Sequence, residues 1–209
     1  MSYADTLVAE TASWLIPDEA LRLEKFRRER IRHYKLVRDL LLDKLGTEDM
    51  DVLEVGGGPM PVSDLLRFRS RTVIDPLSDE YRKVIPCPNH VAMQAENWAW
   101  RSNDSFHLAI ATNSLDHVEN PAQVFYVMSR SITKTGYIAI AGAENNALTH
   151  PHPAHHHNLT SETIHSWADR DFETVWELNF KEHGFRYGWR SYEGRRGQPA
   201  FAILLRRCG

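Results

Sequence analysis

Residues 51–59 read DVLEVGGGP, and this stretch decides the predicted fold. The run Val52–Val55, apolar except for Glu54, is typical of a short strand that is buried on both faces. Three consecutive glycines follow it, and glycine lets the backbone approach a ligand that a β-carbon would exclude. Residues 62–68 are then predicted to form one helix, whose first N–H groups would point toward the glycine turn. This order of strand, turn and helix predicts a ligand-binding crossover unit.

The rest of the chain alternates apolar strand-like runs with helical segments. Helices are predicted at 121–131 and 160–168. Further strands are predicted at 71–75, 91–93, 106–111, 137–141, 174–180 and 200–205. This alternation predicts an α/β, doubly wound, Rossmann-like fold with a mostly parallel seven-stranded sheet. In such sheets a ligand binds beyond the carboxyl ends of the strands, so the residues that follow each strand are the candidates for a site.

The chain is predicted to be one domain, residues 1–209, in two parts. Residues 51–209 form the Rossmann-like core. Residues 1–46 form an N-terminal helical extension, with a helix start at Pro17–Ala20 and a stop at Gly46. The extension is expected to close over the cofactor as a lid, although it could instead cover an edge of the sheet.

Composition narrows the class of protein. The chain has 209 residues and a formal net charge of -3, whereas a dedicated nucleic-acid binder usually carries a basic excess. No run of about 18 apolar residues is present, and the N-terminus lacks the pattern of a signal peptide. Cys87 and Cys208 do not suggest a disulfide framework. We therefore expect a cytoplasmic protein that binds neither nucleic acid nor membrane.

The glycine turn is compatible with two classes of nucleotide-like ligand. Gly56 and Gly58 fit the G-x-G-x-x-G pattern of dinucleotide binding, but Pro61 stands at the third glycine. Asp75, after the second strand, suits the ribose of either class. Glu54 favours the alternative, because a carboxylate at the strand end would repel a pyrophosphate but not a ligand with an ammonium or sulfonium group.

The segment from Asp51 to Gly142 resembles the class I S-adenosylmethionine-dependent methyltransferases, particularly the branch that acts on small molecules. Glu54–Gly58 resembles the first motif of that family, and Asp75 matches the acid that holds the ribose. Gln94–Glu96 is similar to the stretch beside adenine, with Gln94 in place of an acid. Asn113–Pro121 resembles the loop after the fourth strand, with Asp116 in place of a glutamate.

The sequence departs from the family pattern in two further places. Pro59–Pro61 replaces smaller residues of the glycine turn, and His107 replaces a structural aspartate. The resemblance nevertheless implies S-adenosyl-L-methionine as cofactor. The implied cofactor-binding residues are Glu54, Gly56, Gly57, Gly58, Asp75, Pro76, Gln94, Ala95, Glu96, Asn113, Ser114 and Asp116.

The function predicted from these features is transfer of a methyl group from S-adenosylmethionine to an oxygen or nitrogen atom of a small molecule. Two alternatives stay open. One is a catalytically inactive S-adenosylmethionine-binding protein of the same fold, and the other is an NAD(P)-dependent oxidoreductase. The sequence does not indicate the oligomeric state or the acceptor.

Methyl transfer needs a base only when the acceptor atom starts protonated. His117 is the candidate base, since the ordinary pKa of histidine, about 6.5, suits proton removal near neutral pH. The competing interpretation is that His117 packs the loop over the cofactor. Asp116 is expected to orient the loop or the cofactor.

Residues 150–157 read HPHPAHHH and follow the fifth predicted strand. This loop is interpreted as a substrate-binding loop, against the alternatives of an exposed loop with no role and a metal site. Histidine suits zinc, nickel or iron, but no cysteine or carboxylate at a suitable spacing completes the ligand set. No metal is therefore predicted.

Overall fold

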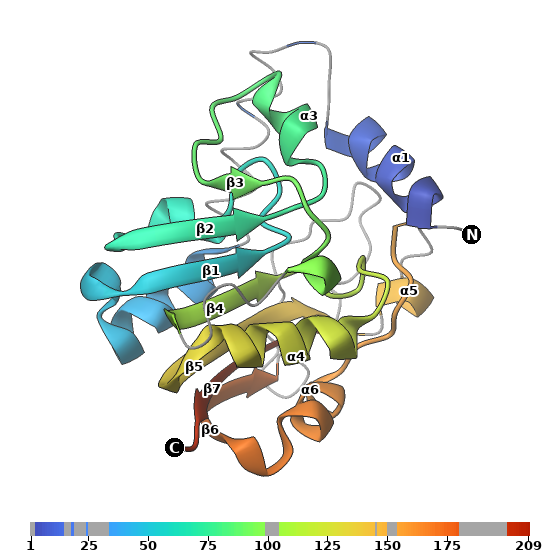
Figure 1. Ribbon diagram of the computed structural model, residues 1–209. Helices are drawn as coiled ribbons and strands as arrows, with labels where there is room; N and C mark the ends of the chain where they lie inside the picture. Colours follow the sequence, from blue (N-terminus) through green and yellow to red (C-terminus); the bar gives the residue numbers. More distant parts are fainter. Residues whose placement is uncertain are drawn as a thin grey trace.

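The computed structural model describes residues 3–14, 18, 24, 34–98, 105–144, 146–149, 154–179 and 200–209. Within this part of the chain, seven strands form one sheet in the order β3-β2-β1-β4-β5-β7-β6 (Figure 1). The strands are β1 (Asp51–Val55), β2 (Ser70–Ile74), β3 (His90–Val91), β4 (Phe106–Thr112), β5 (Ile132–Ala143), β6 (Phe172–Asn179) and β7 (Ala200–Arg207). The predicted mostly parallel, Rossmann-like sheet is confirmed.

The strands that carry the predicted motifs all run in the same direction. β1 pairs in parallel with β2 and with β4, and β4 pairs in parallel with β5. β7 is antiparallel to both of its neighbours, β5 and β6. Consequently the carboxyl ends of β1, β2, β4 and β5 meet at one edge of the sheet, and the loops that follow these strands come together there.

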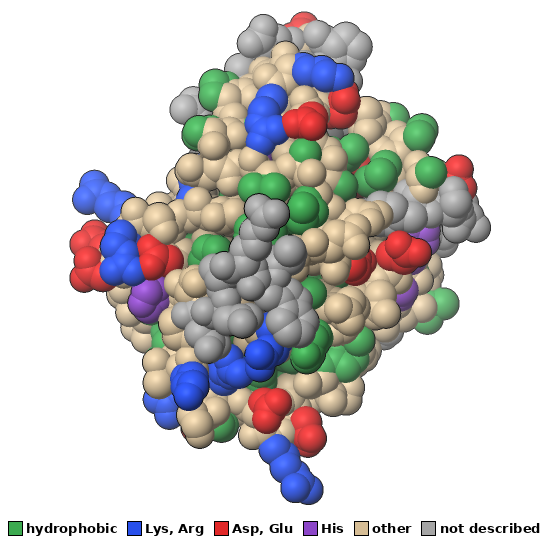
Figure 2. Space-filling model, in the orientation of Figure 1, with side chains coloured by type: hydrophobic (Ala, Val, Ile, Leu, Met, Phe, Trp, Pro, Cys, Tyr) green, Lys and Arg blue, Asp and Glu red, His purple; other side chains and the backbone are tan. Residues whose placement is uncertain are grey.

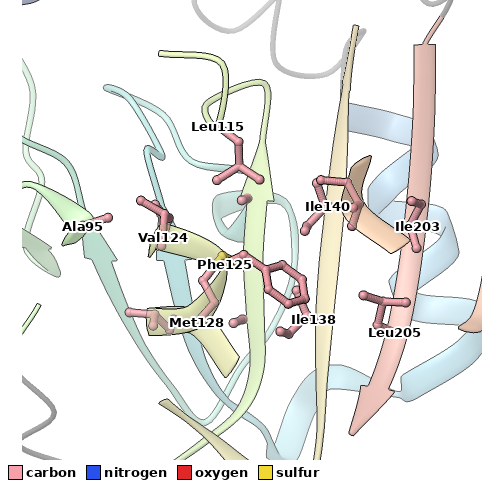
Figure 3. Packing of buried hydrophobic residues seen from close by; sticks show 14 of the residues in the cluster. Ala95, Leu115, Val124, Phe125, Met128, Ile138, Ile140, Ile203 and Leu205 are labelled. Atoms are coloured by element: carbon pink, nitrogen blue, oxygen red, sulfur yellow. The ribbon is translucent and has the colours of Figure 1, made fainter. Parts of the chain in front are cut away.

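Helices cover both faces of the sheet. α4 (Pro121–Ser131) and α6 (Ser161–Ala168) belong to the hydrophobic cluster on one face, where Figure 3 shows Phe125 and Met128 beside Ile138. Residues 34–45 are helical and pack on the other face, where Leu41 is fully buried. A sheet covered in this way needs strands that are apolar on both faces, which is why these strands read as continuous apolar runs.

β4 shows how one strand serves both layers. Leu108 and Ile110 join the cluster beside the helix of residues 34–45, whereas Ala109 and Ala111 join the cluster beneath α4. All four side chains are essentially buried. Successive side chains of a strand point to opposite faces, so a central strand of a doubly wound sheet has no polar face.

The N-terminal segment is divided between two places. Residues 34–45 pack into the core, so the core reaches further toward the N-terminus than residue 51. α1 (Tyr3–Trp14) lies on the side of the molecule to which the parallel strands point, as does α5 (Asn146–Thr149) (Figure 1). The predicted helix start at Pro17–Ala20 lies outside the described residues except for Asp18.

The connection between β1 and β2 differs from its prediction. Residues 62–68 were expected to be one helix, but only a 3₁₀ turn, η2 (Val62–Leu65), forms. The chain then straightens, and the Arg69 N–H donates to the Met50 carbonyl oxygen over 3.0 Å. Only 14 residues separate Val55 from Ser70, and they must also form the glycine turn, so little length is left for a helix.

Two helices start as the sequence predicts. Asn120 and Thr160 stand before α4 and α6, and the side chain of each accepts a hydrogen bond from a backbone N–H of its own first turn. Two shorter 3₁₀ turns, η1 (Thr47–Asp49) and η4 (Asp169–Asp171), and the helix α3 (Ser78–Arg82) join the remaining elements. Residue 180, the predicted end of β6, lies outside the described residues.

The described helices include none with the length and apolar character needed to cross a membrane. Figure 2 shows acidic and basic side chains close to one another on the same face of the molecule. Opposite charges that lie near one another cancel much of each other's field at a distance.

Candidate functional site

The glycine turn begins directly at the end of β1. The Gly56 N–H donates to the Ile74 carbonyl oxygen over 2.8 Å, and Gly56 has a positive φ of 65°. A β-carbon built on Gly56 would overlap the β-carbon of Ser114, which lies in the loop after β4. The backbone of the turn therefore passes against that loop, and only glycine fits at this point.

The Glu54 side chain holds the chain that follows the glycine turn. Its carboxylate is fully buried and accepts hydrogen bonds from the N–H groups of Val62 (2.8 Å) and Ser63 (3.0 Å). These are N–H groups at the start of η2, where a carboxylate is favoured. The Glu54 carboxylate therefore points into the protein and ties the start of η2 to the end of β1.

Asp75 joins the turn to the end of β2. One carboxylate oxygen accepts from the Gly58 N–H and the other from the Leu77 N–H, each over 2.9 Å. Asp75 is 6% exposed. These two bonds fix the carboxylate at the end of β2, directly beside the glycine turn. Pro76 follows, partly buried, where the chain turns toward α3.

Residues 94–97 follow β3 in sequence and are hydrogen-bonded to the segment just before α4. Gln94 precedes the 3₁₀ turn η3 (Ala95–Asn97), and its side-chain oxygen accepts from the Asn97 amide over 2.9 Å. Ala95 is buried in the core. One oxygen of Glu96 accepts from the Glu119 and Asn120 N–H groups over 2.9 and 3.0 Å. Glu96 therefore holds the loop before α4 in place.

The loop after β4 is held against both neighbouring strands. The Asn113 N–H donates to the Ala141 carbonyl oxygen over 2.7 Å, and Asn113 has a positive φ of 51°. The Ser114 hydroxyl donates to the Val55 carbonyl oxygen over 2.9 Å. The candidate residues on this loop are thus fixed beside the glycine turn, as expected for loops at a shared sheet edge.

Asp116 and His117, further along this loop, form one polar cluster with His155. His155 Nδ1 lies 2.6 Å from one carboxylate oxygen of Asp116, and His117 Nε2 lies 3.5 Å from the other. The two rings meet edge to face, with their centroids 4.6 Å apart. Glu10 of α1 adds a second carboxylate beside His117, at 2.8 Å from its Nδ1.

In the absence of a bound cation, the two carboxylates beside His117 favour the protonated form of its ring. Burial alone would lower its pKa, but the Asp116 carboxylate and the hydrogen bond to Glu10 outweigh burial and raise the pKa to about 9. A ring that is already protonated cannot accept a proton from a methyl acceptor. The two carboxylates beside the ring therefore argue against the general-base role predicted for His117.

The three histidines of the predicted substrate loop have different partners. The His156 N–H donates to the Asp116 carbonyl oxygen over 2.9 Å, and its ring bonds to the Thr6 hydroxyl of α1. The His157 ring donates to the Val118 carbonyl oxygen over 2.9 Å. The loop is therefore docked on the segment after β4. Residues 150–153 lie outside the described residues.

Sequence reasoning missed the contribution of α1. Neither Thr6 nor Glu10 belongs to a motif, and both lie more than 100 residues from the histidines that they contact. The only available signal was the expectation that an N-terminal lid covers the site. That expectation names a segment but not its contacting residues.

A family model of the methyltransferase domain matches residues 24–193. The chain belongs to this family. It is an S-adenosylmethionine-dependent methyltransferase, and the NAD(P)-dependent oxidoreductase alternative is not upheld. No curated protein matches the sequence at a significant level.

Solved structures confirm the fold of this methyltransferase. 1,6-Didemethyltoxoflavin-N1-methyltransferase of Burkholderia thailandensis, solved with 1,6-didemethyltoxoflavin and S-adenosylhomocysteine, is 14% identical, with a TM-score of 0.66 and coverage of 99% of this chain and 89% of that one. N-methyltransferase NodS of Bradyrhizobium japonicum with S-adenosylhomocysteine is 15% identical, with a TM-score of 0.65 and coverage of 98% and 97%.

A third similar structure comes from a two-protein assembly. It is the complex between the Haloferax volcanii Trm112 methyltransferase activator and a methyltransferase, with 8% identity, a TM-score of 0.70 and coverage of 96% of both chains. At these identities the three likenesses show a shared fold.

The residues of this methyltransferase fit an S-adenosylmethionine ligand. Glycine at position 56 lets the turn pass directly against Ser114, and the Gly58 N–H holds the Asp75 carboxylate beside the turn. The Asp75 carboxylate would hold the ribose of the cofactor, and the amino-acid end of the cofactor would lie along the glycine turn. When bound, S-adenosylmethionine supplies a methyl group on a sulfonium that is an excellent leaving group.

His90 supports the glycine turn and gives a pH-dependent prediction. Its Nε2 lies 3.0 Å from the Gly58 carbonyl oxygen. Burial lowers the pKa of the ring. The charges of Arg71 and Arg82 also lower this pKa, whereas the charge of Asp64 raises it. The unfolded chain therefore binds a proton at His90 more readily than the folded chain does. The stability that neutral His90 contributes is complete above its ordinary pKa of about 6.5 and is lost as the pH falls below that value.

We expect His90→Gln to reduce this loss, because glutamine keeps a donor for the Gly58 carbonyl and does not titrate. Urea unfolding between about pH 7.5 and pH 5.5 measures the free energy of unfolding of both proteins. The wild type should lose more stability over this range than the variant. If the free energy of unfolding changes equally with pH in both proteins, titration of His90 does not contribute to the stability of the fold.

Proposed function

We propose that the protein transfers a methyl group from S-adenosylmethionine to an oxygen or nitrogen atom of a small molecule. The observation that carries the proposal is the closure of the polar cluster by α1. Glu10 and Thr6 of this helix bond to His117 and His156, which lie on two different loops. A site bridged in this way on its outer side suits a compact acceptor better than a polymer.

The residues supply alignment and exclusion of water, which are what this reaction mainly needs. Gly56 and Asp75 would fix the cofactor at the ends of β1 and β2. The cluster of Asp116, His117 and His155 would face the acceptor, with Asp116 only 6% exposed. Imidazole and carboxylate groups offer both donors and acceptors to a polar acceptor.

The structural neighbours are consistent with such an acceptor. The Burkholderia thailandensis enzyme was solved with 1,6-didemethyltoxoflavin bound, and NodS is described as an N-methyltransferase. These acceptors belong to those proteins, and here they support a small molecule as the class of substrate. The Haloferax volcanii structure is a complex of a methyltransferase with an activator protein.

The test uses a labelled cofactor and a cell extract separated by size. The purified protein should bind S-adenosylhomocysteine with a 1:1 stoichiometry in calorimetry. Radioactive methyl groups from S-adenosylmethionine should then appear in the small-molecule fraction. Label in the protein or nucleic-acid fraction alone would contradict the proposal. Tight binding without transfer to either fraction would favour the catalytically inactive alternative.

A further inference from the structure

The cluster of Asp116, His117 and His155 has the composition of a metal site. Each residue offers one ligand atom, and these three atoms lie within 4.8 Å of one another. They come from two segments, the loop after β4 and the loop that follows α5. The set of two imidazoles and one carboxylate is found both in catalytic zinc sites and in non-haem iron sites.

The His117 ring is oriented as a metal ligand would be. Its Nδ1 lies 2.8 Å from the Glu10 carboxylate, whereas its buried Nε2 has no hydrogen-bond partner among the described residues. Metal-ligating histidines usually donate the other ring N–H to a carboxylate, which fixes the ring and raises its basicity. Glu10 occupies that position, and Nε2 is directed toward Asp116.

The two segments that carry the ligands are locked together. The His156 N–H donates to the Asp116 carbonyl oxygen, and the His157 ring donates to the Val118 carbonyl oxygen, each over 2.9 Å. These bonds leave His155 beside Asp116, with 2.6 Å between Nδ1 and Oδ2. The ligands are therefore positioned before any ion arrives, and small movements would suffice to bind one.

One ligand separation already suits a small tetrahedral ion, whereas the 2.6 Å between His155 Nδ1 and Asp116 Oδ2 must lengthen when an ion binds. Zinc lies about 2.0–2.2 Å from histidine nitrogen and carboxylate oxygen, so its ligand atoms are roughly 3.3 Å apart. The separation between His117 Nε2 and Asp116 Oδ1 is 3.5 Å, close to that requirement. The charges also balance, because the carboxylates of Asp116 and Glu10 together carry the two negative charges that offset a divalent cation.

We propose that Asp116, His117 and His155 bind one zinc-like divalent cation, with a coordination position left for an oxygen atom of the methyl acceptor. This role of the ion rests on the proposed function. A hydroxyl bound to such an ion releases its proton to solvent more readily. Its oxygen then forms a bond to the methyl carbon as the carbon–sulfur bond breaks, and the sulfur keeps that electron pair in S-adenosylhomocysteine.

The test is metal binding by untagged protein that has first been stripped with a chelator. Calorimetry with Zn²⁺ should show one equivalent bound, and Co²⁺ should give the visible absorption of a low-symmetry site. His155→Ala and Asp116→Asn should each weaken Zn²⁺ affinity by at least about tenfold. Glu10→Gln should weaken it to a smaller extent.

His165→Ala is the matched control, because His165 lies on α6 and its ring bonds to Glu177, away from the cluster. It should bind Zn²⁺ like the wild type. If the wild type binds no stoichiometric ion, or binds it as well after His155→Ala, the proposal is overturned and the cluster is a hydrogen-bonded network only. Titration of the metal-free protein with S-adenosylhomocysteine separates the two hypotheses, since the proposed function requires that binding with or without the ion.

Discussion

Gly56→Ala is expected to abolish measurable binding of S-adenosylhomocysteine. Alanine at a φ of 65° costs about 1–2 kcal/mol of conformational energy. The added β-carbon would also overlap the β-carbon of Ser114, so the turn and the loop after β4 must separate. Overpacking of this kind typically costs about 1–3 kcal/mol more. Calorimetry measures the affinity, and thermal unfolding shows how much of the fold survives.

Gly46→Ala is the matched control for backbone strain. Gly46 has nearly the same φ, 61°, but nothing lies within 4 Å of the place where its β-carbon would be. The variant should lose stability by about 1–2 kcal/mol and keep its affinity for the ligand. The difference between the two variants isolates the effect of the close approach to Ser114.

A second variant keeps the prediction testable if Gly56→Ala unfolds. Ser114→Gly removes the β-carbon that the new side chain meets, at the loss of the bond from the Ser114 hydroxyl to the Val55 carbonyl. The double variant should therefore recover part of the stability and part of the affinity. Normal ligand binding by a stable Gly56→Ala protein would show that the turn does not contact the cofactor.

The sheet could be predicted because its strands carry local signals. β1 and β4 are continuous apolar runs, as burial on both faces requires, and β1 has the predicted bounds. α4 was predicted as a helix that starts at Pro121, and α6 as a helix capped by Thr160 or Ser161. Each of these signals lies within the element that it specifies.

The contacts of the site depend on the tertiary structure, and the sequence does not encode them locally. Glu54 was predicted as a cofactor-binding residue, but the sequence did not show that its carboxylate accepts hydrogen bonds from the Val62 and Ser63 N–H groups. The metal alternative for the histidine loop was set aside because no carboxylate at a suitable spacing was visible in the loop. That carboxylate is Asp116, which is 39 residues away in sequence and lies on another loop.

Asp75→Ala is expected to weaken S-adenosylhomocysteine binding by at least about tenfold. The carboxylate would accept hydrogen bonds from the ribose, and a charge-assisted bond is worth about 1.5–3 kcal/mol, whereas about 1.4 kcal/mol suffices for a factor of ten. The variant also leaves the Gly58 N–H without its acceptor, which loosens the turn. Asp51→Ala is the control, because Asp51 stands at the opposite end of β1 and bonds to Arg69 and Ser70.

Adenosine distinguishes the two ways in which Asp75 can act. It contains the ribose but lacks the amino-acid end that would pass along the turn. If Asp75 holds the ribose, Asp75→Ala should lower the affinities for adenosine and for S-adenosylhomocysteine by about the same factor. If Asp75 acts only by fixing Gly58, the larger ligand should lose much more. Unchanged affinity for both ligands in a folded variant would remove Asp75 from the site, because a carboxylate that bonds to either part cannot be lost without effect.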